Sequence, residues 1–174
     1  MRIIFFLTIL FFIPAVNAQD TPEYKKVNPE VKRFVFQPNT IITKRIYDSI
    51  YFDLSYDKGK KWVFMYSYKA KDYEMIADDE YFESIIFEID PPKGNTFSIK
   101  TPQFLNAKVI YNRGCFCPDA GLRQLYEGTI TGRKNEKNIW VVSIDVQIEP
   151  RPGREGLAVN KKLKGNFKSA KLIN

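Results

Sequence analysis

Residues 126–148 read YEGTITGRKNEKNIWVVSIDVQI, and this stretch indicates the fold more clearly than any other part of the chain. Every second residue from 140 to 148 is apolar (Trp140, Val142, Ile144, Val146 and Ile148), and a similar alternation precedes them. A period of two is typical of a strand that buries one face. The polar residues 134–138 separate the two runs. The stretch therefore predicts an antiparallel hairpin that pairs the strand around Ile130 with the strand around Ile144 and buries the apolar side chains of the second run.

Strand-like runs recur at short spacing along the rest of the chain. Residues 50–54 and 62–68 alternate, and Asp57, Lys58 and Gly59 between them predict a turn that joins them as a second hairpin. No amphipathic stretch is long enough for a packed helix. The pattern predicts an all-β fold, a single antiparallel β-sandwich or barrel of about nine to ten short strands. The further runs are residues 34–36, 40–45, 85–89, 97–99, 107–111, 126–132 and 163–172.

The first eighteen residues have the features of a cleaved signal peptide. Arg2 supplies a positive start, residues 3–13 are apolar apart from one threonine, and residues 16–18 (Val-Asn-Ala) place small side chains where a signal peptidase reads. A helix that spans a bilayer needs about 20 apolar residues. Because this run is shorter, we expect residues 1–18 to be removed and the protein to have no transmembrane segment. The expected mature chain begins at Gln19, and its expected location is secreted or periplasmic.

The remaining residues are expected to contain one short arm and one domain. Residues 19–31 are polar and contain two prolines, which predicts a flexible N-terminal arm. Residues 32–174 are then expected to form a single β-rich domain, because this length is typical of one domain. The whole chain carries a net charge of +7, and much of the excess lies in residues 149–174. Such a basic segment can attract an acidic partner, or it can be a solvated face on an edge strand.

The lack of histidine excludes several classes of site. The chain has no His, so it cannot contain a Ser-His-Asp triad, a Cys-His pair or a His-ligated zinc ion. It also lacks the motifs G-x-x-x-x-G-K-[ST], G-x-G-x-x-G and G-x-S-x-G, which hold phosphates, dinucleotides and serine nucleophiles. The sequence therefore predicts no catalytic residue, no cofactor, no metal site and no nucleic-acid partner.

The two cysteines lie close together in the most unusual local stretch, NRGCFCPDAG at residues 112–121. An exported chain usually meets an oxidising environment, so Cys115 and Cys117 are expected to form a local disulfide or a structural thiol pair. Three other interpretations remain open: a soft-metal site, a redox pair with Arg113 as the neighbour that stabilises a thiolate, and a bridge between molecules.

A second candidate is a cluster of acidic residues, Asp78, Asp79, Glu80 and Glu83. Carboxylate oxygens can hold Ca²⁺, and paired carboxylates can hydrolyse glycosides. The spacing of an EF-hand is absent. A solvated acidic loop is therefore the preferred interpretation.

Aromatic residues alternate along residues 62–68, where they either line a ligand platform or pack in the core. Core packing is the more frequent role of such a pattern. If a ligand or partner surface exists, the candidate residues for it are Trp62, Tyr66, Tyr68, Arg113, Lys161 and Lys162.

The function expected from these features is that of an exported, non-enzymatic β-domain that binds a partner protein or small-molecule ligand at the cell periphery. One alternative is a lipocalin-like carrier of a small apolar ligand, which requires an internal cavity of a few hundred Å³. The other alternative is a small enzyme that uses the acidic residues or the Cys-x-Cys pair, which requires convergent carboxyl groups of raised pKa or a reactive thiol.

Overall fold

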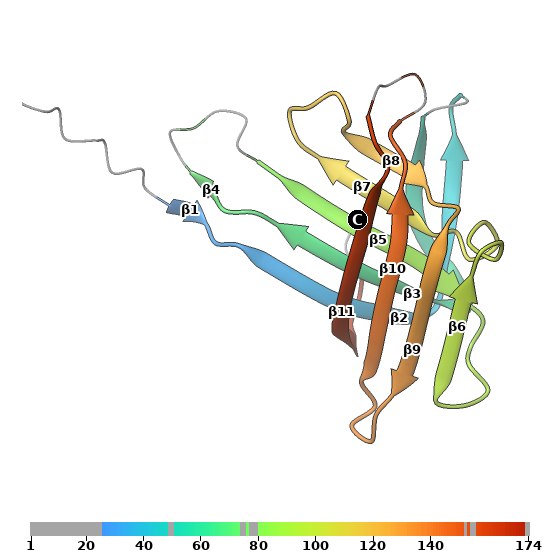
Figure 1. Cartoon of the computed structure of the whole chain (residues 1–174). Helices are drawn as coiled ribbons and strands as arrows, with labels where there is room; N and C mark the ends of the chain where they lie inside the picture. The colour runs from blue at the N-terminus through green and yellow to red at the C-terminus, as the bar shows by residue number, and fades with distance from the viewer. Residues whose placement is uncertain are drawn as a thin grey trace, which may run out of the picture.

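The computed structural model describes residues 26–48, 51–73, 76, 80–151, 153 and 156–172. Every regular element among these residues is a β-strand, which confirms the all-β prediction (Figure 1). The expected signal peptide, residues 1–18, lies outside the described residues. So do residues 19–25 of the expected N-terminal arm, whereas Lys26–Asn28 form a short strand.

Nine strands form one mixed sheet in the order β6-β9-β10-β11-β2-β3-β5-β7-β8, and β1 and β4 form a small second sheet. The prediction of an antiparallel sandwich or barrel needs correction, because β11 pairs in parallel with β2 and the order leaves β6 and β8 as open edges. The strands are β1 (Lys26–Asn28), β2 (Val31–Ile46), β3 (Phe52–Lys69), β4 (Asp72–Tyr73), β5 (Phe82–Ile89), β6 (Thr96–Lys100), β7 (Ile110–Gly114), β8 (Gly121–Gln124), β9 (Gly128–Lys134), β10 (Trp140–Ile148) and β11 (Val159–Ser169).

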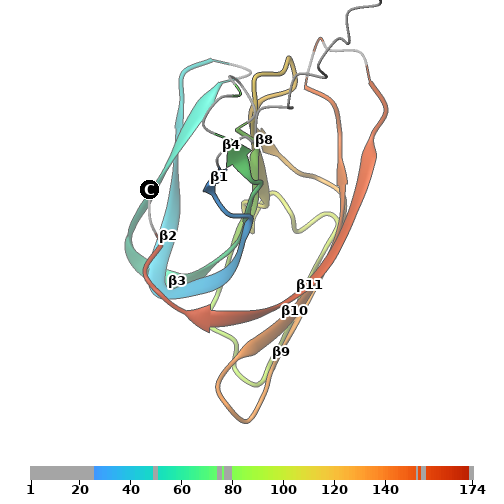
Figure 2. The ribbon, with the colours of Figure 1, turned by 90° about the vertical axis from the view of Figure 1, so that its left-hand side faces the viewer.

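The sheet bends so that its two halves face each other. Strands β6, β9, β10 and β11 cross in front of β2, β3, β5, β7 and β8 (Figures 1 and 2). Aromatic side chains fill the space between the halves, with the Phe64 ring centroid 6.2 Å from that of Trp140 and 5.2 Å from that of Phe97. The bend also needs close contact between β11 and β2, since a Cβ atom on Gly165 would lie 2.1 Å from the Phe34 ring.

The hairpin predicted from residues 126–148 is confirmed. Strand β9 pairs with β10 in antiparallel register, with Ile130 opposite Ile144, and the alternate residues of β10 from Trp140 onward are buried. The connection is closed by Asn135, whose Oδ1 accepts hydrogen bonds from the backbone N–H groups of Lys137 and Ile139, both at 3.0 Å. Asparagine side chains of this kind mimic a backbone turn.

The second predicted hairpin is wrong, and the predicted short strands are replaced there by two long ones. Strand β3 runs without a break through residues 57–59, and its partner is β2 rather than a second half of itself. The pairing slips by a bulge near Asn39, which has a positive φ of 55°. A Cβ atom on Gly59 would lie 2.3 Å from Ile41, so this glycine allows the two strands to approach where they bend.

Beyond this bend, residues 41–46 of β2 and 52–57 of β3 turn back over the outer face of the sheet, and we call them the returning arm (Figure 2). A second apolar cluster, which includes Ile42 and Ile86, lies beneath it. The buried carboxylate of Glu88 fixes the returning arm where it leaves the sheet. Its Oε2 accepts a hydrogen bond from the backbone N–H of Ile42 at 2.7 Å, and its Oε1 forms ion pairs with Lys61 at 3.3 Å and with Lys108 at 3.2 Å.

Candidate functional site

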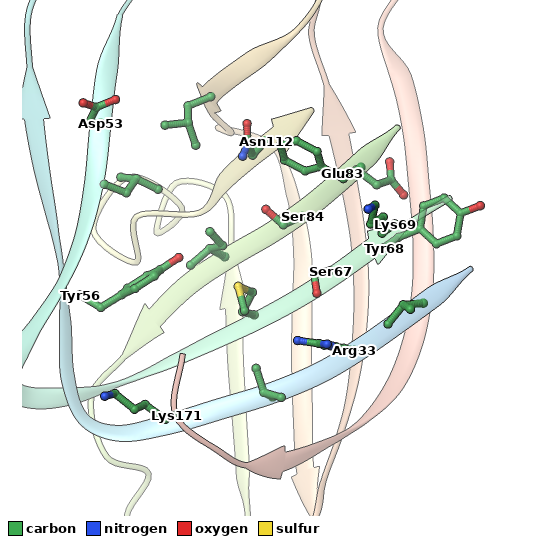
Figure 3. Close-up of a pocket in the computed structure, with 17 residues that line it drawn as sticks. Arg33, Asp53, Tyr56, Ser67, Tyr68, Lys69, Glu83, Ser84, Asn112 and Lys171 are labelled. Atoms are coloured by element: carbon green, nitrogen blue, oxygen red, sulfur yellow. The ribbon is translucent and has the colours of Figure 1, made fainter. Parts of the chain in front are cut away.

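A groove of about 700 Å³ lies between the returning arm and the outer face of the sheet (Figure 3). Strands β2, β3, β5 and β7 supply its floor, and Leu54 and Tyr56 of the arm supply one wall. The groove exists because β3 contributes to both floor and wall, which only a strand that bends back on itself can do. Its volume is in the range of small-molecule sites in proteins.

A row of polar side chains crosses the floor. Arg33 lies opposite Ser67, Ser67 opposite Ser84, and Ser84 opposite Asn112. These four residues come from successive strands and form a line in Figure 3. None of their side chains forms a hydrogen bond or ion pair with any other residue that the structure describes. Their donors and acceptors therefore remain available to a ligand.

The next row of the floor is apolar. Val35, Met65 and Ile86 lie in register beside the polar row, and Leu122 and Tyr56 extend the apolar surface at the sides. Burial raises the pKa of the Tyr56 hydroxyl to about 12. The phenol is therefore neutral at physiological pH. On the other side of the polar row lie Val31 and Phe82, in register with Lys69, so apolar side chains flank the polar row on both sides.

The charges around the groove do not balance. Arg33 and Lys171 have no acidic partner among the described residues. Asp53, the carboxylate of the wall, accepts a hydrogen bond from the Tyr47 hydroxyl at 2.7 Å. Lys69 pairs with Asp72 at 3.0 Å. The bond to Asp53 comes from a neutral group, so the charges at the groove without an opposite partner among the described residues are two cations, Arg33 and Lys171, and one carboxylate, Asp53.

A second polar cluster lies on the inner side of the sheet, centred on Glu83. Its carboxylate accepts hydrogen bonds from the hydroxyls of Tyr111 and Tyr81, both at 3.1 Å, and of Tyr66 at 3.4 Å. It also forms an ion pair with Lys161 of β11. Because Glu83 lies on β5, this pair connects the two halves of the bent sheet.

The ionisation states in this cluster follow from burial and from the ion pair. Burial raises the pKa of the Glu83 carboxyl, but the Lys161 ammonium and the tyrosine hydroxyls outweigh it, so the pKa lies below its usual value. Burial, with the charge of Glu83, raises the pKa of Tyr66. The cluster therefore holds the Glu83 carboxylate among phenols that are neutral at neutral pH.

An arginine network continues from this cluster toward the cysteines. Arg113 donates from Nε to the Tyr111 hydroxyl at 3.0 Å and pairs with Asp119 at 2.9 Å, and Arg123 pairs with the same carboxylate at 2.9 Å. Burial raises the pKa of the Asp119 carboxyl, but the two arginines outweigh burial, so the pKa lies below its usual value. The network fixes the connection between β7 and β8 to the strands on either side.

Cys115 and Cys117 lie in this connection as a close pair, with their Cα atoms 5.2 Å apart. That separation lies within the range for a disulfide. We predict that mass spectrometry of denatured, unreduced protein will show no thiol that can be alkylated, and that reduction will expose two. Two alkylatable thiols before reduction, unchanged by a chelator, would contradict both the disulfide and the metal site.

The structure brings together half of the predicted ligand-surface residues. Tyr66, Arg113 and Lys161 meet around the Glu83 cluster, where their polar groups are already paired. The other three lie apart. Trp62 packs against Trp140 at 6.1 Å between ring centroids, and Lys162 pairs with Asp145 on an exposed strand face at 2.8 Å.

Tyr68 lies at the end of the groove and contacts Tyr81, with 6.1 Å between ring centroids. The polar row of the groove was missed from the sequence. Ser67 is the residue between the aromatics Tyr66 and Tyr68, so alternation alone places it on the opposite face. The other three members come from strands whose pairing the sequence does not reveal.

The predicted acidic cluster is divided. Asp78 and Asp79 lie outside the described residues, Glu80 is exposed, and Glu83 is buried among tyrosines rather than solvated. Within the part of the chain that the structure describes, no three acidic or cysteine side chains are grouped to hold a metal ion. The same part contains no helix that is long and apolar enough to span a membrane.

Comparison of the chain with protein-family models, with curated proteins and with solved structures found no match.

Proposed function

We propose that this chain is an exported, non-enzymatic β-domain that binds a ligand or partner at the cell periphery, and that the groove beneath the returning arm is its binding site. The observation that carries the proposal is the unpartnered polar row beside an apolar row in a cavity of about 700 Å³. Ligand sites are typically apolar with a few placed polar groups that fix orientation.

The packing of the interior supports a site on the outer face. A lipocalin-like carrier holds its ligand inside the fold, whereas Phe64, Phe87 and Trp140 fill the space between the two halves here. The groove instead lies on the outer face of the sheet, beneath Leu54 and Tyr56 of the returning arm. A ligand can therefore enter it while the aromatic core stays packed.

The carboxyl groups also favour binding over carboxylate catalysis. A general acid that works near neutral pH needs a raised pKa. Both Glu83 and Asp119 have a lowered pKa, because Lys161 and the two arginines outweigh the effect of burial. At neutral pH these groups are therefore anions that are paired within the fold.

The proposal is tested by filling the groove. We predict that Ser67→Trp, which places an indole at the centre of the polar row, reduces binding of the uncharged fluorescent dye Nile red at least about tenfold, because the added side chain occupies the space of the dye. The measurement is a fluorescence titration of folded protein. The matched control is Ser143→Trp, at an exposed position on the outer face of β10. Equal binding by wild type and Ser67→Trp would refute the groove as the site.

A further inference from the structure

We infer that the groove takes an anionic amphiphile with a single hydrocarbon chain and a carboxylate head, of the fatty-acid type. This inference rests on the proposed function and adds the chemical class of the ligand. Three observations carry it: an excess of positive charge, with two cations that lack an acidic partner against the single carboxylate of Asp53, a line of hydrogen-bonding groups, and an adjoining apolar surface.

The head of the ligand is determined by charge. Arg33 lies at the β2 end of the polar row, and its guanidinium points along the floor toward the side where Lys171 lies (Figure 3). Guanidinium groups bind carboxylates through two parallel hydrogen bonds. Because neither cation has an acidic partner among the described residues, a ligand carboxylate would supply the missing charge.

The body of the ligand is determined by the floor. The apolar row begins at Val35 on β2 and continues through Met65 on β3 to Ile86 on β5, and Leu122 of β8, opposite Asn112, adds an apolar side chain at the far end of the polar row. The distance from β2 to β7 is three strand spacings, about 14 Å. A hydrocarbon chain that starts at Arg33 can therefore lie across the strands beneath Tyr56 and Leu54, with one side against apolar side chains.

The polar row explains why a purely apolar ligand fits less well. Ser67, Ser84 and Asn112 cross the floor of the groove, and an apolar molecule that covered them would remove their water without replacing its hydrogen bonds. Ser84 is only 7% exposed. A ligand with a carboxylate at one end satisfies the charged end of the row and leaves the rest of the row to water.

The test compares three probes with the same chain and different heads: dodecanoate, dodecanol and dodecyltrimethylammonium, each below its micelle-forming concentration. Displacement of bound Nile red reports their affinities. We expect dodecanoate to bind most tightly. We expect Arg33→Gln to weaken dodecanoate by about ten- to a hundredfold, the loss of a charged hydrogen bond, and to leave dodecanol unchanged. Arg133→Gln, an exposed arginine on the other half of the sheet, is the matched control.

The outcomes separate the two proposals. Suppose that Ser67→Trp abolishes the binding of all three probes. If dodecanoate then binds the unaltered protein no more tightly than dodecanol does, or if Arg33→Gln does not weaken dodecanoate binding, the groove is a binding site and the anionic head is refuted. If Ser67→Trp changes no probe, the groove itself is refuted. Loss of dodecanoate binding in Arg33→Gln with an unchanged melting temperature supports both.

Discussion

The Val142→Asp variant should lose several kcal/mol of its free energy of unfolding, about the penalty for an unpaired buried charge. Val142 is fully buried and points from β10 into the core between the two halves of the sheet. A domain of this size is stable by about 5–15 kcal/mol in total, so the loss removes a large part of it. Thermal unfolding followed by circular dichroism measures the effect.

The neighbouring residue provides the control. Val141 lies on the opposite face of the same strand, where its partners are Arg133 and Asn166. Val141→Asp should therefore change stability by less than about 1 kcal/mol, since an aspartate opposite an arginine on an open face is tolerated. Equal melting temperatures for the two variants would show that the assigned faces of β10 are wrong.

The second large effect is expected for Lys161→Met. This change leaves the buried Glu83 carboxylate without its cation, and removal of one partner from a buried pair is strongly destabilising. The Lys161 side chain is 25% exposed, and three tyrosine hydroxyls still bond the carboxylate. We therefore expect a loss of about 3 kcal/mol at neutral pH, the lower end of the range for such pairs.

The effect should depend on pH in a defined direction. In the unaltered protein the pKa of Glu83 lies below its usual 4.5, so the pair stabilises the fold above that pH and this contribution is lost as the pH falls through the folded pKa. Without Lys161, burial should raise the pKa. The stability difference between the two proteins should therefore be largest at neutral pH and shrink in acid, measured by urea unfolding at several pH values.

Two further variants make this prediction specific. Glu83→Gln combined with Lys161→Met removes both charges and should recover part of the lost stability. Lys162→Met removes the adjacent lysine, whose exposed pair with Asp145 should contribute less than about 1 kcal/mol. A loss in Lys162→Met as large as that in Lys161→Met would mean that net charge, rather than the Glu83 pair, governs stability.

The sequence predicted those parts of the fold in which a strand buries one face and pairs with the next strand along the chain. The alternation from Trp140 to Ile148 sufficed for the β9–β10 hairpin. The same reasoning failed at Asp57, Lys58 and Gly59. A glycine that lets two strands approach closely at a bend cannot be distinguished in the sequence from a glycine in a turn. Bends in long strands depend on packing against distant residues such as Glu88.

The groove could not be predicted for a related reason. The polar row forms only through three strand pairings, which bring together Arg33, Ser67, Ser84 and Asn112. Two of these pairings, β3 with β5 and β5 with β7, join strands that are not consecutive in the sequence. Tyr66, Arg113 and Lys161 were predicted as a surface. They do meet, but around Glu83, whose carboxylate the sequence placed in a solvated loop.

The junction of β11 with β2 has a consequence for the order in which the domain folds. It rests on two pairs, Lys168 with Val35 and Ser169 with Phe36, and it is reinforced by the N–H of Leu172, which donates to Gln37 across 135 residues of chain. Local hairpins form in about 1–10 μs, whereas contacts this distant in sequence slow folding. During synthesis, β2 therefore has no neighbour on this side until residue 169 has emerged from the ribosome, and the joining of the two halves is the last step to become available.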